Sequence, residues 1–305
     1  MQKVIVICGP TASGKTALSI ELAKRINGEI VSADSMQIYD EMSIGTAKPD
    51  KEEMQGIKHY LVGCISPTKR YSVSEYKKDA TAALEEIIKS KKTPIVVGGT
   101  GLYVNSLIYG IDYPEIETNL EYREELEQIA NEKGLSYLYE MAEKVDKNAM
   151  KNISVNDKKR IMRVLEIYKE TGKTKTQLEI ESRKNGVPYE YHVYAIHMPR
   201  EVLYDRINRR VDIMIEKGLI EEVDSLYKKY GNDLCTSVQG IGYKEVIDYL
   251  NGEYTKEEMI EKIKMETRRY AKRQLTWFRK IPNIIWLDGL DDIQNNVNII
   301  LEGIE

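Results

Sequence analysis

The chain has 305 residues, of which 42% are hydrophobic and 31% are charged. This composition is ordinary for a globular protein with a sizeable core, and the length suggests about two domains. No apolar run approaches the ~20 residues that span a bilayer, so we expect no membrane partner. The net charge of −4 argues weakly against a nucleic-acid partner, but the local distribution of charge matters more than the sum. A strand starting at Lys3 leaves no room for a signal peptide, and three widely spaced cysteines form no C-x-x-C pair. We therefore expect a reduced, cytoplasmic protein without a zinc site.

A glycine-rich loop near the N-terminus is the most specific motif in the chain. It lies between a β-branched apolar run, residues 3–8, that predicts a buried strand and a helical pattern over residues 17–26. It matches the phosphate-loop pattern Gly-x4-Gly-Lys-[Ser/Thr], in which backbone N–H groups cradle a phosphate chain, the lysine neutralises the outer phosphate and the hydroxyl ligates Mg²⁺. We therefore predict that a di- or triphosphate and Mg²⁺ bind here, with Lys15 on the phosphate and Thr16 on the metal. The binding residues are Gly9, Pro10, Thr11, Ala12, Ser13, Gly14, Lys15 and Thr16.

Alternating strand and helix patterns follow the loop. Strands are predicted at 29–33, 59–62 and 94–98, and helices at 73–90 and from 102 onwards. This alternation predicts an α/β fold of the P-loop NTPase type, with a parallel sheet flanked by helices.

Polar residues follow two of these strands. The carboxyl ends of parallel strands face the ligand crevice, so Asp34 is expected to meet the ligand of the phosphate loop. Its position alone leaves a Mg²⁺-water ligand and a general base about equally favoured. In the turn Gly98–Gly101, Thr100 could donate a hydrogen bond near the phosphates, although a turn needed only for packing is the commoner case.

The pattern becomes purely helical after Asp112. Helices are predicted at 121–132, 135–144 and 156–171, the last ending at Thr171-Gly172. We therefore expect a first part of the core at 1–113, a helical insertion at 114–190, and the remainder of the core with basic C-terminal helices at 191–305. That remainder has strand patterns at 191–197 and 284–287, and helical patterns at 200–217, 221–229 and 255–279, with a further helix opened by Gly240.

Basic residues gather in three places. Residues 158–160 with Arg163 form one cluster, and residues 268–280 hold six basic residues, no acidic one, and interleaved aromatics. Cations hold a phosphate backbone and aromatics stack on unpaired bases, although a helix that covers the core with Trp277 buried is the simpler interpretation. A third run, Arg206, Arg209 and Arg210, could place one guanidinium on a phosphate or could form a solvated face; the sequence alone does not select among them.

Several motifs taken together resemble a known family. In order along the chain they resemble those of bacterial tRNA dimethylallyltransferases, the isopentenyl-tRNA transferase (IPP transferase) family, and the match covers nearly the whole chain. These motifs are Gly9–Thr16, Asp34–Tyr39, Ile44–Pro49, Gly98–Tyr103, Asn156–Arg160 with Arg163–Glu166, Gly240–Glu245 and Ala271–Arg279.

The resemblance implies an activity and catalytic roles. The family transfers a dimethylallyl group from dimethylallyl diphosphate to N6 of adenosine 37 in tRNAs that read codons beginning with U, which gives N6-isopentenyladenosine and releases diphosphate. It implies that Asp34 is the general base, that Thr100 lies near the reacting centre and that Arg210 binds the diphosphate. The implied cofactor is Mg²⁺, and we expect a monomer.

The resemblance also implies the tRNA contacts. The helical insertion would clasp the anticodon stem-loop, and the target base would be extruded into a pocket beside the phosphate loop. The implied tRNA-binding residues are Asp34, Ser35, Met36, Gln37, Thr100, Arg123, Lys159, Arg160, Ile161, Met162, Arg163, Gln239, Gly240, Gly242, Tyr243, Lys244, Arg269, Lys272, Arg273 and Trp277.

Three other activities compete with this hypothesis. An adenylate isopentenyltransferase shares the loop and the prenyl donor but needs neither the insertion nor a basic C-terminal helix. A nucleotide kinase would bind ATP and carry an arginine-rich lid. A phosphate-loop RNA-binding protein without catalysis would have no use for Asp34 and Thr100.

Overall fold

The computed structural model describes residues 1–113, 119–184, 186–234 and 236–304. The chain divides into two compact units, one formed by Met1–Ile108 with Pro188–Glu305 and the other by Tyr109–Val187. From the sequence, these divisions are expected a few residues later, at 113 and 190. Among the described residues, no helix combines the length and the apolar character that a membrane span requires.

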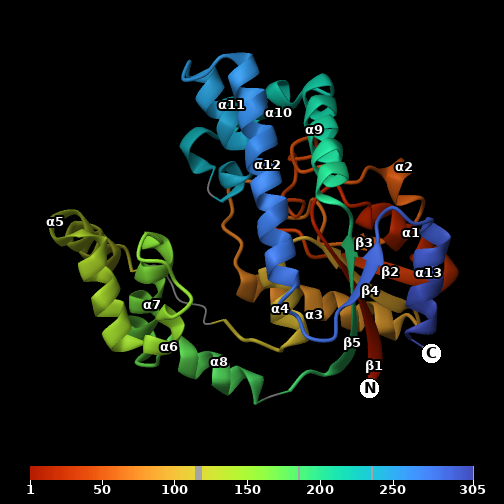
Figure 1. The fold of residues 1–305 in the computed structure, drawn as a ribbon, viewed down its shortest axis with the longest axis horizontal. Coiled ribbons are helices and arrows are strands. Elements are labelled where there is room, and N and C mark those ends of the chain that lie inside the picture. The colour runs from red at the N-terminus through yellow and green to blue at the C-terminus, as the bar shows by residue number, and fades with distance from the viewer. Residues whose placement is uncertain (114–118, 185, 235, 305) are drawn as a thin grey trace. The chain divides into compact units, whose positions relative to one another are not determined.

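The larger unit is built on one parallel sheet (Figure 1). Strand β1 is central, and the order of the strands is β3-β2-β4-β1-β5-β6 with every pair parallel. The predicted α/β fold is therefore confirmed, although the strand expected at 59–62 is only two residues long. The strands are β1 (Gln2–Cys8), β2 (Gly28–Ser32), β3 (His59–Tyr60), β4 (Thr93–Gly98), β5 (Tyr189–His197) and β6 (Ile285–Asp288).

The register of the sheet brings three loops together. Cys8, the last residue of β1, pairs with Gly98 at the end of β4, and Ser32 at the end of β2 pairs with Val97. The segments that leave β1, β2 and β4 therefore start side by side at one edge of the sheet. These are the phosphate loop, the segment from Asp34 and the turn containing Thr100.

Helices cover both faces of the sheet because the side chains of β1 alternate between two cores. Ile5 and Ile7 pack with α1 (Lys15–Arg25) and α13 (Ile293–Glu302), which lie together in Figure 1. Val4 and Val6 face a larger core. That core includes residues of α3 (Val73–Lys89), α4 (Gly101–Ile108), α9 (Arg200–Glu216), α10 (Leu219–Tyr230), α11 (Tyr243–Leu250) and α12 (Lys256–Phe278).

Helix α12 is the longest regular element of this unit that the sequence predicts correctly. Its N-terminus is closed by reciprocal bonds, in which the Glu258 N–H donates to Thr255 Oγ1 (3.2 Å) and the Thr255 N–H donates to Glu258 Oε2 (2.8 Å). Two α-helices among the described residues of this unit are not predicted from the sequence. They are the single-turn α2 (Lys51–Met54) and α13.

The smaller unit is helical, as expected. Gly134, with φ 84° and ψ 164°, interrupts α5 (Leu120–Val145), and this break explains why the sequence pattern reads as two helices. Helices α6 (Lys147–Met150) and α7 (Lys158–Thr171) follow, and α7 ends at Gly172 in the left-handed conformation (φ 69°). The core of this unit contains Leu126, Leu138, Met150, Ile161 and Leu165.

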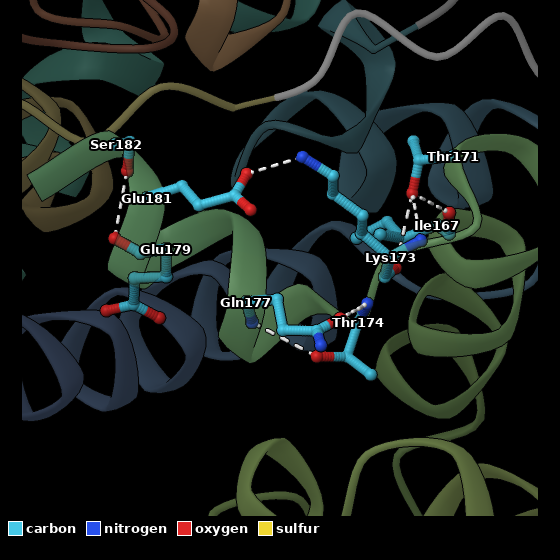
Figure 2. Close-up of polar contacts among 8 residues, drawn as sticks. All are labelled: Ile167, Thr171, Lys173, Thr174, Gln177, Glu179, Glu181 and Ser182. Atoms are coloured by element: carbon cyan, nitrogen blue, oxygen red, sulfur yellow. Dashed lines mark hydrogen bonds and ion pairs between the residues drawn. The ribbon is translucent and has the colours of Figure 1, made fainter.

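A fourth helix of this unit, α8 (Lys175–Arg183), is missed by the sequence analysis although its start carries a signal (Figure 2). The Gln177 N–H donates to Thr174 Oγ1 (3.0 Å) and the Thr174 N–H donates to Gln177 Oε1 (2.9 Å). This is the Thr-x-x-Gln form of the capping box. The Lys173 ammonium adds an ion pair to Glu181 at 2.7 Å.

Candidate active site

The phosphate loop has the geometry of an anion-binding loop. It joins β1 to α1, and its two template glycines have positive φ, 147° at Gly9 and 91° at Gly14. A Cβ on Gly9 would lie 3.2 Å from the Ile196 carbonyl oxygen, so the close passage over β5 favours glycine. Ser13 Oγ is buried and has no hydrogen-bond partner among the described residues. With the free N–H groups at the start of α1, the loop offers donors that a phosphate group would satisfy.

Lys15 lies in the loop, and no carboxylate among the described residues forms an ion pair with it. Its Nζ donates to the Pro10 carbonyl at 2.6 Å. Burial, together with repulsion from Arg210, lowers the pKa of Lys15 from 10.5 to about 8, while Asp34 and Cys8 oppose the shift. An anion bound in the loop would relieve the unfavourable environment of this charge.

Only one of the three clustered arginines touches the loop. Arg210 Nη1 donates to Thr11 Oγ1 at 3.3 Å, and burial lowers the pKa of its guanidinium. Arg209 is instead paired with Asp205 at 2.9 Å on the surface, and Arg206 is exposed. The structure therefore makes the selection that the sequence could not, because the helical phase of α9 points Arg210 towards the loop.

Asp34 follows β2 at the same edge of the sheet. Its Oδ1 accepts from the N–H groups of Met36 (2.9 Å) and Gln37 (3.2 Å), which fixes the carboxylate in a tight turn. Its charge acts on Lys15, Arg210 and the Tyr270 phenol, so the carboxylate lies close to the loop and to α12. Its second oxygen, Oδ2, makes no hydrogen bond within the described parts of the chain.

Thr100 ties the turn after β4 to the segment after β2. Its Oγ1 accepts from the Ser35 N–H (3.0 Å) and donates to Ser35 Oγ (3.2 Å), and its own N–H donates to the Ala33 carbonyl (3.1 Å). The turn is therefore tightly packed, as the commoner case expects, and the Thr100 hydroxyl lies beside the segment of Asp34. The hydrogen bond that Thr100 was expected to donate near the phosphates stays a prediction.

Two residues of α12 complete this site, and the sequence analysis did not single them out. Gln274 is 5% exposed and makes hydrogen bonds to both the phosphate loop and the glycine turn. Burial raises the pKa of Tyr270, with Asp34 adding to the shift and Thr100 opposing it, so the phenol beside them stays neutral. Their signal in the sequence was the i, i+4 spacing, which places both side chains on one face of α12.

The segment after Asp34 is fixed by a single carboxylate. Glu222 of α10 accepts from the N–H groups of Ser43 (2.9 Å), Ile44 (2.8 Å) and Gly45 (3.1 Å). The carbonyls of Thr46 and Ala47, just beyond, accept the amide of Gln37 at 3.2 and 3.1 Å. This explains why the motif Ile44–Pro49 accompanies Asp34–Tyr39.

Tyr243 does not have the surface position expected for a tRNA contact. It is 2% exposed, and its hydroxyl donates to Glu222 Oε1 at 2.7 Å. A Cβ on Gly45 would lie 2.5 Å from the Tyr243 ring, so the ring fills the space beside the loop. Gly240 and Gly242 are buried as well, whereas Gln239 and Lys244 are exposed.

The outer face of α12 is basic. Lys272 and Arg273 are exposed, and Arg269 is exposed while paired with Glu266 at 2.6 Å. Trp277 is only half-buried and lies against Gly101, where a Cβ would come within 2.4 Å of the indole. Its indole thus packs against the turn, as the simpler interpretation expects.

In the helical unit, the expected RNA-binding residues have two different positions. Lys159 and Arg160 are exposed, and Arg123 and Arg163 both reach the buried carboxylate of Glu166, at 3.4 and 3.5 Å. Ile161 and Met162, in contrast, are 0% and 1% exposed in the core of this unit. The expectation of side-chain contacts from these two residues is therefore wrong, because the apolar face of α7 turns inward.

The loop could hold Mg²⁺ in the way that phosphate loops do. Among the described residues, no group of three or more His, Cys, Asp and Glu side chains forms a metal cage. Mg²⁺ needs none, because it usually retains water and binds one or two protein oxygens together with substrate phosphates. Thr16 is exposed at the start of α1, and Asp34 lies close enough for its charge to act on Lys15, so the residues present fit the ion.

Known proteins are similar to this chain over nearly its whole length. The sequence profile of the family described as IPP transferase matches residues 37–281. The chain belongs to the IPP transferase family. Among its relatives in this family, the tRNA dimethylallyltransferase of Acetivibrio thermocellus is 49% identical over 300 residues, which is 98% of this chain and 96% of that protein. The enzyme of the same name from Thermoanaerobacter pseudethanolicus is 49% identical over 296 residues, 96% of this chain and 93% of its own.

Solved structures of family members have the same fold. The full-length tRNA isopentenylpyrophosphate transferase of Bacillus halodurans aligns with a TM-score of 0.74 at 44% identity, covering 99% of this chain and 97% of its own. A eukaryotic dimethylallyltransferase acting on tRNA aligns with a TM-score of 0.80 at 32% identity, covering 100% of this chain and 78% of its own. The family assignment suggested by the motifs is therefore confirmed.

Proposed function

We propose that this chain is a tRNA dimethylallyltransferase. It transfers the dimethylallyl group of dimethylallyl diphosphate to N6 of adenosine 37 in tRNAs that read codons beginning with U. The products are N6-isopentenyladenosine and diphosphate. The observation that carries the proposal is the meeting of the phosphate loop, Asp34 and Thr100 at one edge of the sheet in a member of the IPP transferase family.

The chemistry requires a stabilised leaving group. The adenine N6 amine is a weak nucleophile because its lone pair is delocalised into the ring. The allylic carbon must therefore acquire cation character while the bond to the diphosphate oxygen breaks. Lys15, Arg210 and the free N–H groups of the loop stabilise the departing diphosphate. Thr16 would hold Mg²⁺ beside the phosphates, and the ion would supply further charge neutralisation.

Asp34 accepts the proton that N6 loses as the new C–N bond forms. Oδ1 is occupied by two backbone N–H groups, so Oδ2 remains for the amine. The Asp34 carboxylate lies close enough to Lys15 and Arg210 for its charge to act on both cations. The hydrogen bond from the Ser35 N–H to Thr100 Oγ1 holds Thr100 beside the segment that carries Asp34. This arrangement favours the general-base role of Asp34 over that of a metal ligand alone.

RNA binding uses the reacting centre for the target base and other surfaces for the rest of the RNA. The target base leaves the anticodon loop and enters the crevice lined by Asp34, Ser35, Met36 and Gln37. The exposed cations of α12, with Lys244 and Gln239, bind the RNA backbone. The helical unit clasps the anticodon stem-loop through Lys159, Arg160, Arg163 and Arg123. We propose that the enzyme acts as a monomer in the cytoplasm, where its tRNA substrate is found.

The test is transfer of radiolabelled dimethylallyl from its diphosphate, with Mg²⁺, to unmodified tRNA carrying A36-A37-A38 and, in parallel, to AMP. Label on tRNA alone supports the proposal. Label on AMP alone would identify a free-nucleotide enzyme and would leave the basic face of α12 unexplained. Absence of label on both would overturn prenyl transfer and favour a nucleotide kinase.

A further inference from the structure

One buried amide joins the two halves of the catalytic site. Gln274 Oε1 accepts from the Thr11 N–H at 2.9 Å, and its Nε2 donates to the Gly99 carbonyl at 2.9 Å. The first bond ends in the phosphate loop, and the second ends one residue before Thr100. Because the amide oxygen faces a donor and the amide nitrogen faces an acceptor, the orientation of the side chain is unambiguous.

The glycines around Thr100 are explained by this approach of α12. A Cβ on Gly99 would lie 2.1 Å from Gln274 Nε2, and a Cβ on Gly101 would lie 2.4 Å from the Trp277 indole. Neither glycine has a positive φ, so both are needed for space and not for backbone conformation. Helix α12 therefore packs on both sides of Thr100, and Gln274 provides the polar half of that contact.

We propose that Gln274 is the positioning residue that fixes the separation between the diphosphate loop and Thr100. This inference rests on the proposed function, because that separation matters only if a leaving group in the loop and a nucleophile beside Asp34 and Thr100 must react with each other. No strand hydrogen bond performs this task, since the loop and the turn both lie beyond the last paired residues, Cys8 and Gly98. Gln274 holds both segments with one side chain.

The consequence is a specific kinetic signature. Group transfer requires the reacting atoms to be held close and aligned, and displacement by about 1 Å costs up to 10²-fold in rate. Loss of the amide should therefore lower the rate of the chemical step while leaving the exposed cations that bind RNA unchanged. A residue that only stabilises the fold would lower the melting temperature, and the rate per folded molecule would remain the same.

The experiment compares Gln274→Met, which keeps the length but removes both hydrogen bonds, with Gln274→Asn, which keeps the amide but cannot span both partners. The control is Gln294→Met, the same chemical change at an exposed site on α13. Single-turnover transfer to tRNA is measured at saturating dimethylallyl diphosphate, on enzyme shown to be folded by its melting curve. We expect both Gln274 variants to be about 10- to 100-fold slower, with unchanged KM for tRNA, and the control to match the wild type. A wild-type rate in folded Gln274→Met would overturn the inference.

A second readout does not depend on transferase activity. Amide hydrogen exchange at Thr11, measured by NMR, should accelerate at least tenfold in both Gln274 variants and remain unchanged in Gln294→Met. Unchanged protection of Thr11 would show that Gln274 does not hold the loop. If the wild-type enzyme transferred no label, the proposed function would fall, while the exchange result would still decide whether Gln274 joins the two segments.

Discussion

The titration of Lys15 offers a sharp test of the phosphate loop. Its pKa falls from the ordinary 10.5 to about 8 because the ammonium is buried and lies near Arg210. At about 1.36 kcal/mol per pH unit, this shift corresponds to at most about 3.4 kcal/mol against the charged form. Solvent that reaches this half-buried side chain reduces the value. Because folding lowers the pKa, the cost is fully present below about pH 8 and is lost as the pH rises towards 10.5, so the ligand-free protein gains stability across that window.

A bound diphosphate reverses this balance, because its negative charge raises the pKa of Lys15. The dissociation constant should therefore be flat below about pH 8 and rise above it, approaching tenfold per pH unit. The assay is calorimetric titration, from pH 6.5 to 9.5, with a non-reacting dimethylallyl diphosphate analogue that carries sulfur at the bridging position. The last ionisation of a phosphate monoester lies near pH ~6, below the window of interest.

Lys15→Arg provides the control, because a guanidinium remains charged throughout this range. The dissociation constant of this variant for the analogue should change little between pH 6.5 and 9.5, whatever its absolute value. A flat profile for the wild type, or the same break near pH 8 in Lys15→Arg, would refute the assignment of the titrating group to Lys15.

Three substitutions test other parts of the site. Asp34→Ala should abolish transfer and leave tRNA affinity largely intact, because the carboxylate acts on N6; transfer at the wild-type rate would remove Asp34 as the base. Arg210→Gln should raise KM for dimethylallyl diphosphate about tenfold or more, because a charge-assisted contact worth about 1.5–3 kcal/mol is lost. The same substitution at the exposed Arg206 should leave KM unchanged. Equal effects of the two substitutions in steady-state assays would contradict the selection of Arg210. Gly101→Ala should destabilise the protein by about 1–3 kcal/mol in urea unfolding, because the new Cβ meets the Trp277 indole at 2.4 Å; a neutral result would mean that α12 moves freely away from the turn.

Local sequence patterns predicted the elements whose determinants are also local. The β-branched run before Gly9, the template positions of the loop, and the Thr255–Glu258 capping box all act within a few residues, and the structure has each of them. Helix α8 could have been found in the same way from Thr174 and Gln177. The break at Gly134 was predicted as a boundary between helices, because a glycine in a polar helical pattern weakens it.

The remaining features depend on packing between distant segments. Whether Arg206, Arg209 or Arg210 meets the loop is decided by the rotation of α9 against the sheet, which no single stretch of sequence encodes. Ile161, Met162 and Tyr243 are buried because other helices pack against α7 and α11. The sequence motifs that contain these residues therefore did not show which members are buried and which are exposed. Gln274 was hidden for the same reason, because both of its partners lie more than 170 residues away along the chain.

The carboxylate of Glu222 has a consequence for the thermodynamics of ligand binding. The segment 43–48 has no regular secondary structure, and an unrestrained backbone loses about 1–2 kcal/mol of conformational entropy per residue when it is ordered. Here three backbone N–H groups donate to Glu222, and two backbone carbonyls accept from the Gln37 amide. The conformational entropy of this segment is therefore lost during folding. A ligand that docks beside Gln37 therefore meets a preorganised wall, and its affinity is not reduced by the ordering of that wall.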